Sequence, residues 1–239
     1  MVRLRMRAAM SKQRKMIVMD TVRHFRMMAK KMLTRPECRD LTLQQRQHQV
    51  ALQAGYASWS ALLTAEQNAD DFEHRLTCLM IEFPQLHRYG ADGENSDYVY
   101  VPGGGRPTRD QVRAAYVDRR ADLREHVEVI RWVAEWMVSE IAMTKTVRPE
   151  ANSYGLKHIA EDAMFYERRD LGDYVGNGEA IAAAMLVGFT PRKIEEHPRN
   201  VSFNMSMRDI NRLRAERRAR SMDEYARRQT QQESVRSAG

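Results

Sequence analysis

The chain has 239 residues, of which 43% are apolar, and this content excludes a wholly disordered chain because it suffices for one large or two small packed domains. The net charge of +7 comes from the two ends: residues 1–39 carry 12 basic and 2 acidic side chains, residues 207–239 carry 9 and 5, and the middle is acidic. Basic clusters bind polyanions by releasing counterions from phosphates, although solvated tails have the same composition.

Cysteine, histidine and hydropathy patterns narrow the class of protein further. Cys38 and Cys78 lack the spacing of a disulfide framework or a zinc site, and no histidine lies in a metal-binding motif. No apolar run is long enough to span a bilayer, and the basic start lacks the apolar segment of a secretory signal. We therefore expect a cytoplasmic protein with no membrane contact, no cofactor and no metal.

The first predicted helix follows a basic arm at residues 1–16. Its apolar residues recur at spacings of four, three, four and three, which predicts one buried face: Val18, Val22, Phe25, Ala29 and Met32. Pro36 ends the pattern. The basic residues of this helix are left for contact with phosphate.

Two further helices follow within a predicted small helical domain at residues 17–88. Thr42 and Gln45 form a capping-box pattern, and the helix that they open ends at Gly55. Ser58 is placed to cap the next helix. We interpret Trp59 as a core residue, because a single helical aromatic at this spacing is usually packed inside.

A fixed pattern, A-x-x-x-G-[YF]-x-x-W-x-x-L, spans the end of the second helix and the third. The matching residues are Ala51, Gly55, Tyr56, Trp59 and Leu62. Together with the basic helix before it, this pattern resembles a small helical domain found beside glyoxalase-like domains and in mobile-element proteins, although it departs at Gln45–Gln47. The resemblance implies a fold and no particular activity.

A helix at residues 72–88 and a loop at residues 89–107 come next. Pro84 stops the helix, whose apolar side includes Phe72 and Leu76. The glycines at residues 103–105 precede a helix start, but no Gly-Lys-Ser/Thr follows. The run therefore predicts a connector and not a nucleotide-binding loop.

The longest helical signal begins at Thr108, which forms a second capping box with Gln111. An apolar stripe continues to Lys145 before Pro149 closes it. One unbroken helix would be roughly 50 Å long and could act as a spine or as the surface of a homo-oligomer. Two packed helices are the alternative, because Arg119 and Arg120 interrupt the stripe.

Residues 152–206 form a turn-rich module in which Asn177 is expected to cap a helix that ends at Gly188. Thr190 and Pro191 then suit the start of another helix, with Arg192 and Lys193 on its first turn, where a recognition helix contacts DNA. A plain structural hairpin is the alternative, because two glutamates and a proline follow at 195, 196 and 198.

The same module carries patterns at Ser153–Glu161, Tyr174–Ala184, Gly188–Phe189 and Asn200–Asn204. In spacing these resemble segments of uncharacterised plasmid and phage proteins, which implies the setting of a mobile genetic element. Alternating apolar residues at 201, 203 and 205 allow one short strand.

Ser206 and Asp209 are placed to cap a final helix that carries eight arginines between Arg208 and Arg228. Its end, QTQQESVRSAG, is expected to be disordered. The nearest approach to an acid–base cluster is His158 with Glu161 and Asp162 on the module's first helix, and two or three such residues do not by themselves form a catalytic site.

These features predict an all-α, multi-helix fold with helix-turn-helix-like hairpins and at most one short strand pair. The domains are the arm at 1–16, the small helical domain at 17–88, the loop at 89–107, the long helical region and C-terminal module at 108–206, and the basic helix with its tail at 207–239.

The predicted function is that of a non-enzymatic accessory protein of a plasmid, phage or integrative element, bound to DNA or to a nucleoprotein complex. The residues predicted to contact phosphate are Arg14, Lys15, Arg23, Arg26, Lys30, Lys31, Arg192 and Lys193. The alternative is an adaptor or inhibitor that engages a protein complex through the acidic middle and the face of Trp132 and Trp136.

Overall fold

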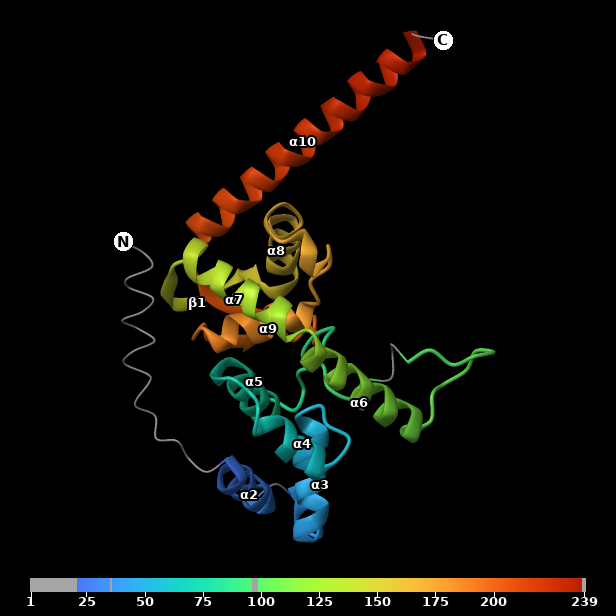
Figure 1. Cartoon of the computed structure of the whole chain (residues 1–239), viewed down its shortest axis with the longest axis vertical. Coiled ribbons are helices and arrows are strands. Elements are labelled where there is room, and N and C mark those ends of the chain that lie inside the picture. The colour runs from blue at the N-terminus through green and yellow to red at the C-terminus, as the bar shows by residue number, and fades with distance from the viewer. Residues whose placement is uncertain (1–20, 35, 96–98, 238–239) are drawn as a thin grey trace. The chain divides into compact units, whose positions relative to one another are not determined.

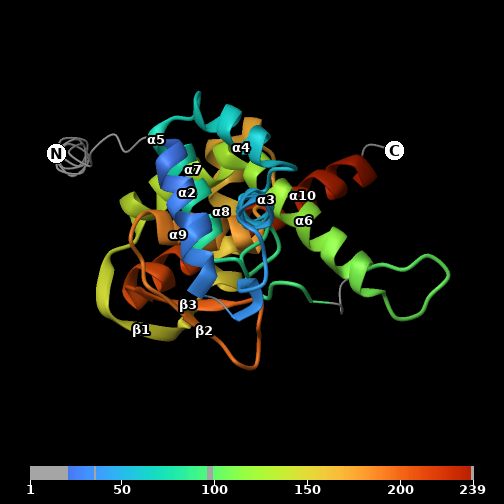
Figure 2. The same ribbon diagram turned by 90° about the horizontal axis from the view of Figure 1, so that it is seen from below.

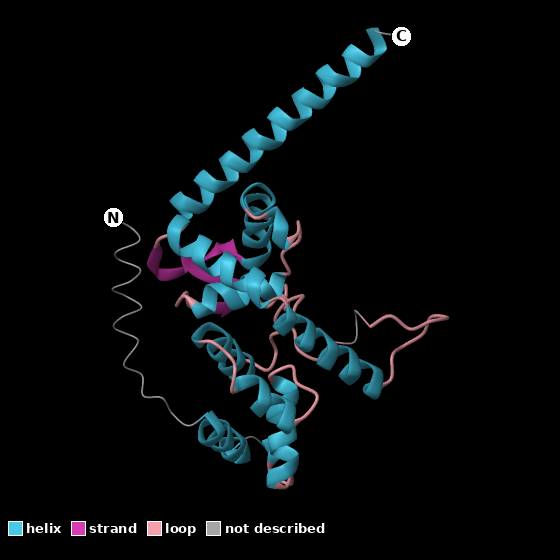
Figure 3. Cartoon of the chain, viewed as in Figure 1, coloured by secondary structure: helices cyan, strands magenta, loops and turns pink. Residues whose placement is uncertain are grey.

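The computed structural model describes residues 21–34, 36–95 and 99–237, and the side chains of 21–23, 37 and 223–237 lie outside the description. The described chain is mostly helical and includes one small three-stranded antiparallel sheet (Figure 3). The prediction of an all-α fold with at most one pair of strands is therefore wrong by one strand, since the sheet has three. The chain divides into two compact units, Met1–Arg131 and Trp132–Gly239, and each is described by itself.

Unit 1 is helical throughout its regular elements. These are α2 (Thr21–Lys31), the short 3₁₀ turns η1 (Met32–Thr34) and η2 (Pro36–Cys38), α3 (Leu43–Gln53), α4 (Trp59–Glu66), α5 (Asp71–Glu82), α6 (Arg109–Glu125) and the start of α7 (Val127–Glu140) (Figure 1). The capping boxes at Thr42 and Thr108 and the cap at Ser58 are confirmed. Local capping chemistry was therefore enough to locate three helix starts.

The apolar face predicted for the first helix is buried. Phe25, Ala29 and Met32 belong to one core with residues of α3 and α4, and Trp59 packs against the edge of that core. Trp59 is half-buried, so its interpretation as a core residue is confirmed only in part. Val18 lies outside the described residues, and the side chain of Val22 lies outside the description.

A fully buried arginine of α6 joins the C-terminal ends of two other helices in unit 1. Arg120 of α6 is 0% exposed, and its guanidinium donates to the backbone carbonyls of Gln53, Met80, Phe83, Pro84 and Leu86. The Nε–H···O distance to Gln53 is 2.7 Å and the Nη1···O distance to Pro84 is 2.8 Å. The last carbonyls of a helix lack hydrogen-bond donors within the helix, and the Arg120 guanidinium donates to such carbonyls at the ends of α3 and α5.

The turn after α3 brings the backbone against the same arginine. Gly55 has φ +78°, and a Cβ built there would lie 2.9 Å from the carbonyl oxygen of Arg120. Glycine at this position is therefore required twice, by the left-handed backbone and by the close approach of α6.

The long helical signal resolves into two helices, which confirms one of the two alternatives. The break lies at His126, whose backbone has φ −94° and ψ 28°, and its Nδ1 donates to the carbonyl oxygen of Asp122 at 2.7 Å. Arg119 and Arg120 do not interrupt the helix, because Arg120 itself belongs to the buried side. The expected continuation to Lys145 is wrong, since residues 143–152 form a strand.

Unit 2 combines helices with the sheet. Its elements after α7 are β1 (Met143–Asn152), α8 (Ser153–Glu167), the 3₁₀ turn η4 (Arg169–Leu171), α9 (Asn177–Leu186), β2 (Pro191–Lys193), β3 (Val201–Met205) and α10 (Met207–Ser237). The strand order is β1-β3-β2, with β3 in the centre (Figure 2). α8 packs against α9, α10 and the sheet. The inward positions predicted for α8 are confirmed: Leu156, Ile159, Ala160 and Ala163 are buried.

The central strand holds its neighbours through a buried amide as well as through the backbone. All five residues of β3 are buried. The Nδ2 group of Asn204 donates to the carbonyl of Thr144 in β1 at 2.9 Å, and its Oδ1 accepts from the backbone N–H of Thr190, beside β2, at 2.6 Å. A polar side chain in a sheet core is stable when both ends of its amide are paired in this way.

Two further predictions for unit 2 are corrected. Asn177 is the first residue of α9 and not its cap: the cap is Gly176, whose N–H donates to the buried carboxylate of Glu179 at 2.7 Å. The Asn177 amide instead reaches Arg199 and Asn200. The tail expected to be disordered is helical up to residue 237, because α10 continues through it.

We expect Gly55→Ala to lower the free energy of unfolding of unit 1 by roughly 2–4 kcal/mol, since the backbone conformation and the clash both oppose a Cβ. The matched control is Gly104→Ala, which has φ +82° but open space around it. Urea denaturation of the full chain measures both variants. Equal losses in the two would show that the close approach of α6 has no energetic effect.

We expect Arg120→Lys to destabilise unit 1 by at least about 3 kcal/mol, because an ammonium cannot reproduce the planar donor fork that serves five carbonyls. Arg113→Lys, on the exposed side of the same helix, is the control and should stay within about 0.5 kcal/mol of the parent. A similar stability for the two variants would contradict the role assigned to Arg120.

Candidate functional site

The basic residues of α2 lie on the side of the helix that the core leaves free. Arg26, Lys30 and Lys31 are exposed, whereas Phe25 and Ala29 are fully buried on the opposite side. We call these three exposed residues the α2 basic face. The helix thus has one buried apolar side and one exposed basic side.

Three other predicted contacts of the N-terminal region cannot be placed. Arg14 and Lys15 lie outside the described residues, and Arg23 lies on α2 with its side chain outside the description. The α2 basic face is therefore the part of this predicted surface that the structure positions.

The predicted recognition helix after Thr190 is wrong. Arg192 and Lys193 are exposed on the edge strand β2, where they pair with Ser202 and Val201 of β3. The N–H of Thr190, expected to open a helix, is held by the Asn204 side chain. Pairing with the next strand therefore overrides the local helix-start pattern, and the two basic residues cannot enter a groove on a helix.

The final helix carries a second basic surface. Ile210 and Leu213 are its buried residues near the start, and Met222 is 68% exposed. Arg217 and Arg218 are exposed and form no ion pair with a described carboxylate, and we call them the α10 basic pair. Their separation from the apolar contacts leaves them open to an external anion.

Other arginines of α10 are already engaged. Arg212 contacts Glu140 and Glu216 at 2.9 Å each, and Arg220 contacts Asp162 at 2.9 Å. These residues attach or stiffen the helix, so they are less available to a ligand than the α10 basic pair.

The acid–base group expected on α8 separates into two networks. His158 Nδ1 lies 2.6 Å from Glu161 Oε2, while Glu161 Oε1 accepts from Lys157 Nζ at 2.6 Å and from the N–H of Val175 at 3.2 Å. Asp162 instead pairs with Arg220. Glu161 therefore holds α8 to the segment before α9, which is a structural role.

A second histidine–carboxylate pair is closed to chemistry. His87 and Asp92 are buried, with His87 Nε2 2.8 Å from Asp92 Oδ1. The N–H of Tyr89 donates to the other ring nitrogen, Nδ1, at 3.1 Å. Since Nδ1 accepts, Nε2 carries the proton, and neither nitrogen is open to a substrate.

A third group, which the sequence patterns did not reveal, surrounds Cys78, and we call it the thiol cluster. It consists of His24, Glu66, His74, Thr77 and Cys78. The Cys78 sulfur lies 3.4 Å from His24 Nε2 and 3.6 Å from His74 Nε2, and His74 Nδ1 lies 2.7 Å from Glu66 Oε2. The spacing of His74 and Cys78, four residues apart on one helix, was the available sequence signal.

Charge and burial act oppositely on the two imidazoles of the thiol cluster. Hydrogen bonds with Cys78 and then with Glu66 raise the pKa of His74 from its ordinary 6.5 to about 10. Burial, followed by the neighbouring His74 charge, lowers the pKa of His24. At neutral pH His74 is therefore an imidazolium and His24 is neutral.

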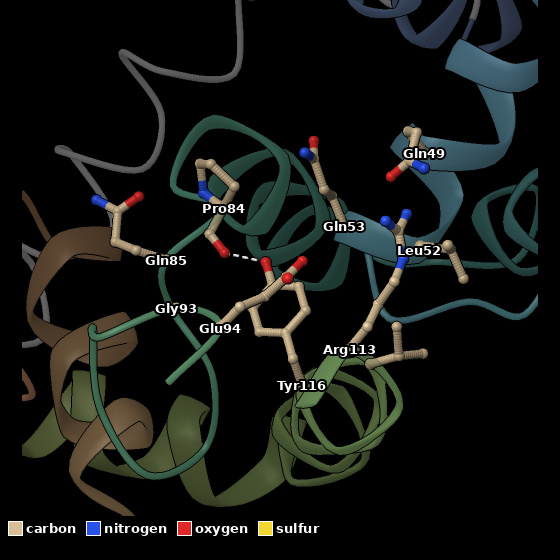
Figure 4. A pocket seen from close by; sticks show the side chains of 10 residues that line it. Gln49, Leu52, Gln53, Pro84, Gln85, Gly93, Glu94, Arg113 and Tyr116 are labelled. Atoms are coloured by element: carbon tan, nitrogen blue, oxygen red, sulfur yellow. Dashed lines mark hydrogen bonds between the residues drawn. The ribbon is translucent and has the colours of Figure 1, made fainter. Parts of the chain in front are cut away.

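Unit 1 also has a hollow of about 290 Å³, lined mainly by polar side chains of α3, α6 and the loop after α5 (Figure 4). Tyr116 points across it and donates its hydroxyl proton to the carbonyl of Pro84. Burial raises the pKa of Tyr116. With its hydroxyl engaged, the residue packs α6 against this loop, and the hollow presents no thiol or imidazole to a ligand.

Neither a metal-binding group nor a membrane-spanning helix is found among the described residues. No group of three or more His, Cys, Asp or Glu side chains is arranged to hold a metal ion within residues 21–34, 36–95 and 99–237. In the same ranges, no helix combines the length and the apolar character that a membrane crossing needs.

Comparisons of the chain with protein-family models, with curated proteins and with solved structures give no match. The resemblances to the glyoxalase-associated domain and to plasmid and phage proteins therefore stay predictions. Function has to be argued from the surfaces and clusters themselves.

We expect the thiol cluster to shape the dependence of stability on pH. The contribution of His74 is complete below its unfolded pKa of about 6.5 and is lost as pH rises through about 10. The lowered pKa of His24 acts in the other direction, so its effect reduces stability as pH falls through 6.5.

Urea denaturation across this pH range provides the measurement. The free energy of unfolding of the parent should decline as pH rises above 6.5, and His74→Gln should lack the part of this decline that His74 causes. The matched control is His48→Gln, which replaces an exposed histidine of α3. A constant difference between parent and His74→Gln at all pH values would contradict the assignment of an imidazolium to His74.

Proposed function

We propose that this protein is a non-enzymatic, cytoplasmic accessory protein that binds the phosphate backbone of a nucleic acid, with DNA or a DNA–protein complex as its partner. The binding surfaces are the α2 basic face and the part of α10 beyond Leu213, which we call the outer part of α10. The setting of a plasmid, phage or integrative element belongs to the proposal and rests on the sequence patterns between residues 153 and 204.

The form of α10 is the observation that carries the proposal. Its 31 residues correspond to roughly 47 Å of helix, and among its described side chains, those of residues 207–222, the buried apolar ones are Ile210 and Leu213 near its start. In Figure 1, the helix continues far beyond the elements of its own unit that hold its beginning. The sequence beyond Leu213 is predominantly polar, which is not the pattern of a helix that completes a core.

The charge of the outer helix favours an anionic partner. Beyond Leu213 the sequence has seven arginines, against Glu216, Asp223, Glu224 and Glu233. The α10 basic pair is exposed and is not neutralised by a described carboxylate. Arginine is well suited to phosphate because its planar donor fork matches two phosphate oxygens.

The α2 basic face supports the same ligand by an independent route. Its three cations project from a helix whose other side is anchored in the core, so they are held at fixed positions on a folded surface. Contacts of this kind give affinity without reading base sequence. Since the expected recognition helix is absent at residues 190–193, the proposal includes no sequence-specific reading by that segment.

The alternative function is that of an adaptor for a protein complex, and the tryptophan face that it would use is less exposed than the sequence predicted. Trp132 and Trp136 stack with ring centroids 6.3 Å apart, but Trp136 is only 6% exposed and so cannot serve as an open anchor. Recovery of a protein partner after nuclease treatment, with no binding to nucleic acid, would favour this class.

We expect a labelled DNA duplex to bind the full-length protein with strong salt dependence. Arg217→Ala/Arg218→Ala and Arg26→Ala/Lys30→Ala/Lys31→Ala should each weaken binding and lower the slope of log K against log salt by about 0.9 for each phosphate that the variant no longer neutralises. Fluorescence anisotropy at several salt concentrations measures both quantities.

The matched control is Arg106→Ala/Arg109→Ala, which removes two exposed arginines at the start of α6 and in the loop before it. It should change the slope less than the α10 double variant, which carries the same change in net charge. Equal effects would indicate a diffuse charge effect, and absence of binding at low salt would reject the proposal.

A further inference from the structure

Three groups of the thiol cluster lie in series on unit 1: a carboxylate, an imidazole and a thiol. Glu66 of α4 contacts His74, and His74 contacts Cys78, its neighbour one turn later on α5. Cys78 is partly exposed, in contrast to the buried Cys38. A nucleophile beside a base that a third group orients is the arrangement found in activated thiols.

The carboxylate fixes which atom of His74 faces the sulfur. The Glu66 side chain is fully buried, accepts from the Thr77 hydroxyl at 2.5 Å, and engages His74 Nδ1 at 2.7 Å. The imidazolium therefore directs Nδ1–H toward the carboxylate and Nε2–H toward Cys78. The same two bonds keep His74 charged although it is partly buried.

The other charged groups around the sulfur come from two helices. His24 of α2 also lies beside the sulfur, and its charge is influenced by Lys31 and Glu82 as well as by His74 and Glu66. The carboxylate of Glu66 is paired with His74 Nδ1. The charged group next to the sulfur is therefore the cationic His74 ring. A cation at this position stabilises a thiolate, which is the nucleophilic form of cysteine.

We propose that Cys78 is a nucleophilic thiol and a site of modification by soft electrophiles and by peroxide. This inference is independent of the proposed binding of nucleic acid. It assigns His74 as a positioning and proton-donating residue and Glu66 as the residue that orients His74.

The reaction with hydrogen peroxide can be written with every atom in place. The Cys78 thiolate attacks one peroxide oxygen, a sulfur–oxygen bond forms and the oxygen–oxygen bond breaks. The sulfur is oxidised to a sulfenic acid, and the leaving hydroxide takes the Nε2 proton of His74 and departs as water. His74 lies within 3.6 Å of the sulfur, so its proton is available at the place where the hydroxide leaves.

The first test compares alkylation rates of the full-length protein by iodoacetamide at neutral pH, measured for each cysteine by peptide mass spectrometry. Cys78 should react roughly three- to tenfold faster in the folded protein than in urea, because the cationic His74 ring beside the sulfur favours the charged, nucleophilic form of cysteine. Cys38, which is 4% exposed, should react more slowly in the folded protein than in urea.

Two variants separate activation from simple exposure. His74→Gln should abolish the acceleration, whereas His48→Gln should keep it. Glu66→Gln provides a second test and should also reduce the acceleration, because it changes the carboxylate that orients His74. If either cluster variant fails to fold, the ratio of the Cys78 alkylation rates in the folded and urea-unfolded parent still decides. An alkylation rate of Cys78 that both variants leave unchanged would overturn the proposal.

The second test traps the oxidation product. Peroxide treatment in the presence of dimedone should label Cys78 and leave Cys38 unlabelled, and His74→Gln should lose most of the label. Slower alkylation of Cys78 in the folded chain than in urea, or equal dimedone labelling of the two cysteines, would show that Cys78 is an ordinary packing residue.

Discussion

The packing of unit 1 depends on a fully buried cation, Arg120, whose hydrogen bonds described above are to backbone oxygens and not to a carboxylate. Arg120 collects the carbonyls that α3 and α5 leave unpaired at their C-terminal ends, where the helix dipoles place partial negative charge. Burial lowers the pKa of Arg120, but an arginine in a protein keeps its proton. The cost of desolvating the charge is therefore offset by dipoles that would otherwise be unsatisfied, and this fixes how α3, α5 and α6 meet.

Unit 2 uses buried polar side chains in the same way. Asn204, Glu179 and Ser153 each satisfy a backbone N–H at a point where a strand or helix begins. Lys157 adds a link from α8 to the carbonyl of Val175 at 3.1 Å. Several of these residues belong to the patterns that suggested plasmid and phage proteins. Their positions explain the patterns as requirements of the α8–α9 junction and the sheet, which gives them a physical basis that is independent of any particular activity.

The sequence was informative wherever a structural choice depends on neighbours within one or two helical turns. The capping boxes at Thr42 and Thr108 and the buried face of α8 were predictable for this reason. Strands β1 and β2 were not predictable in this way. In β2, Thr190 and Pro191 locally suit a helix start, and only pairing with β3 makes this segment a strand. The candidate sites follow the same division: the α2 basic face and the spacing of His74 and Cys78 are local, while the approach of His24 and Glu66 to them depends on tertiary packing.

The outer part of α10 shows how folding and binding can be linked in this chain. Helix propensity alone gives marginal stability over such a length, and pairs such as Arg212–Glu216 contribute only about 0.2–0.5 kcal/mol each. The arginines that engage Glu140 and Asp162 anchor the helix to its unit. A polyanion lying along this surface would reduce the repulsion among its arginines and favour the helical form. Affinity and helix content are thus expected to rise together as salt is lowered.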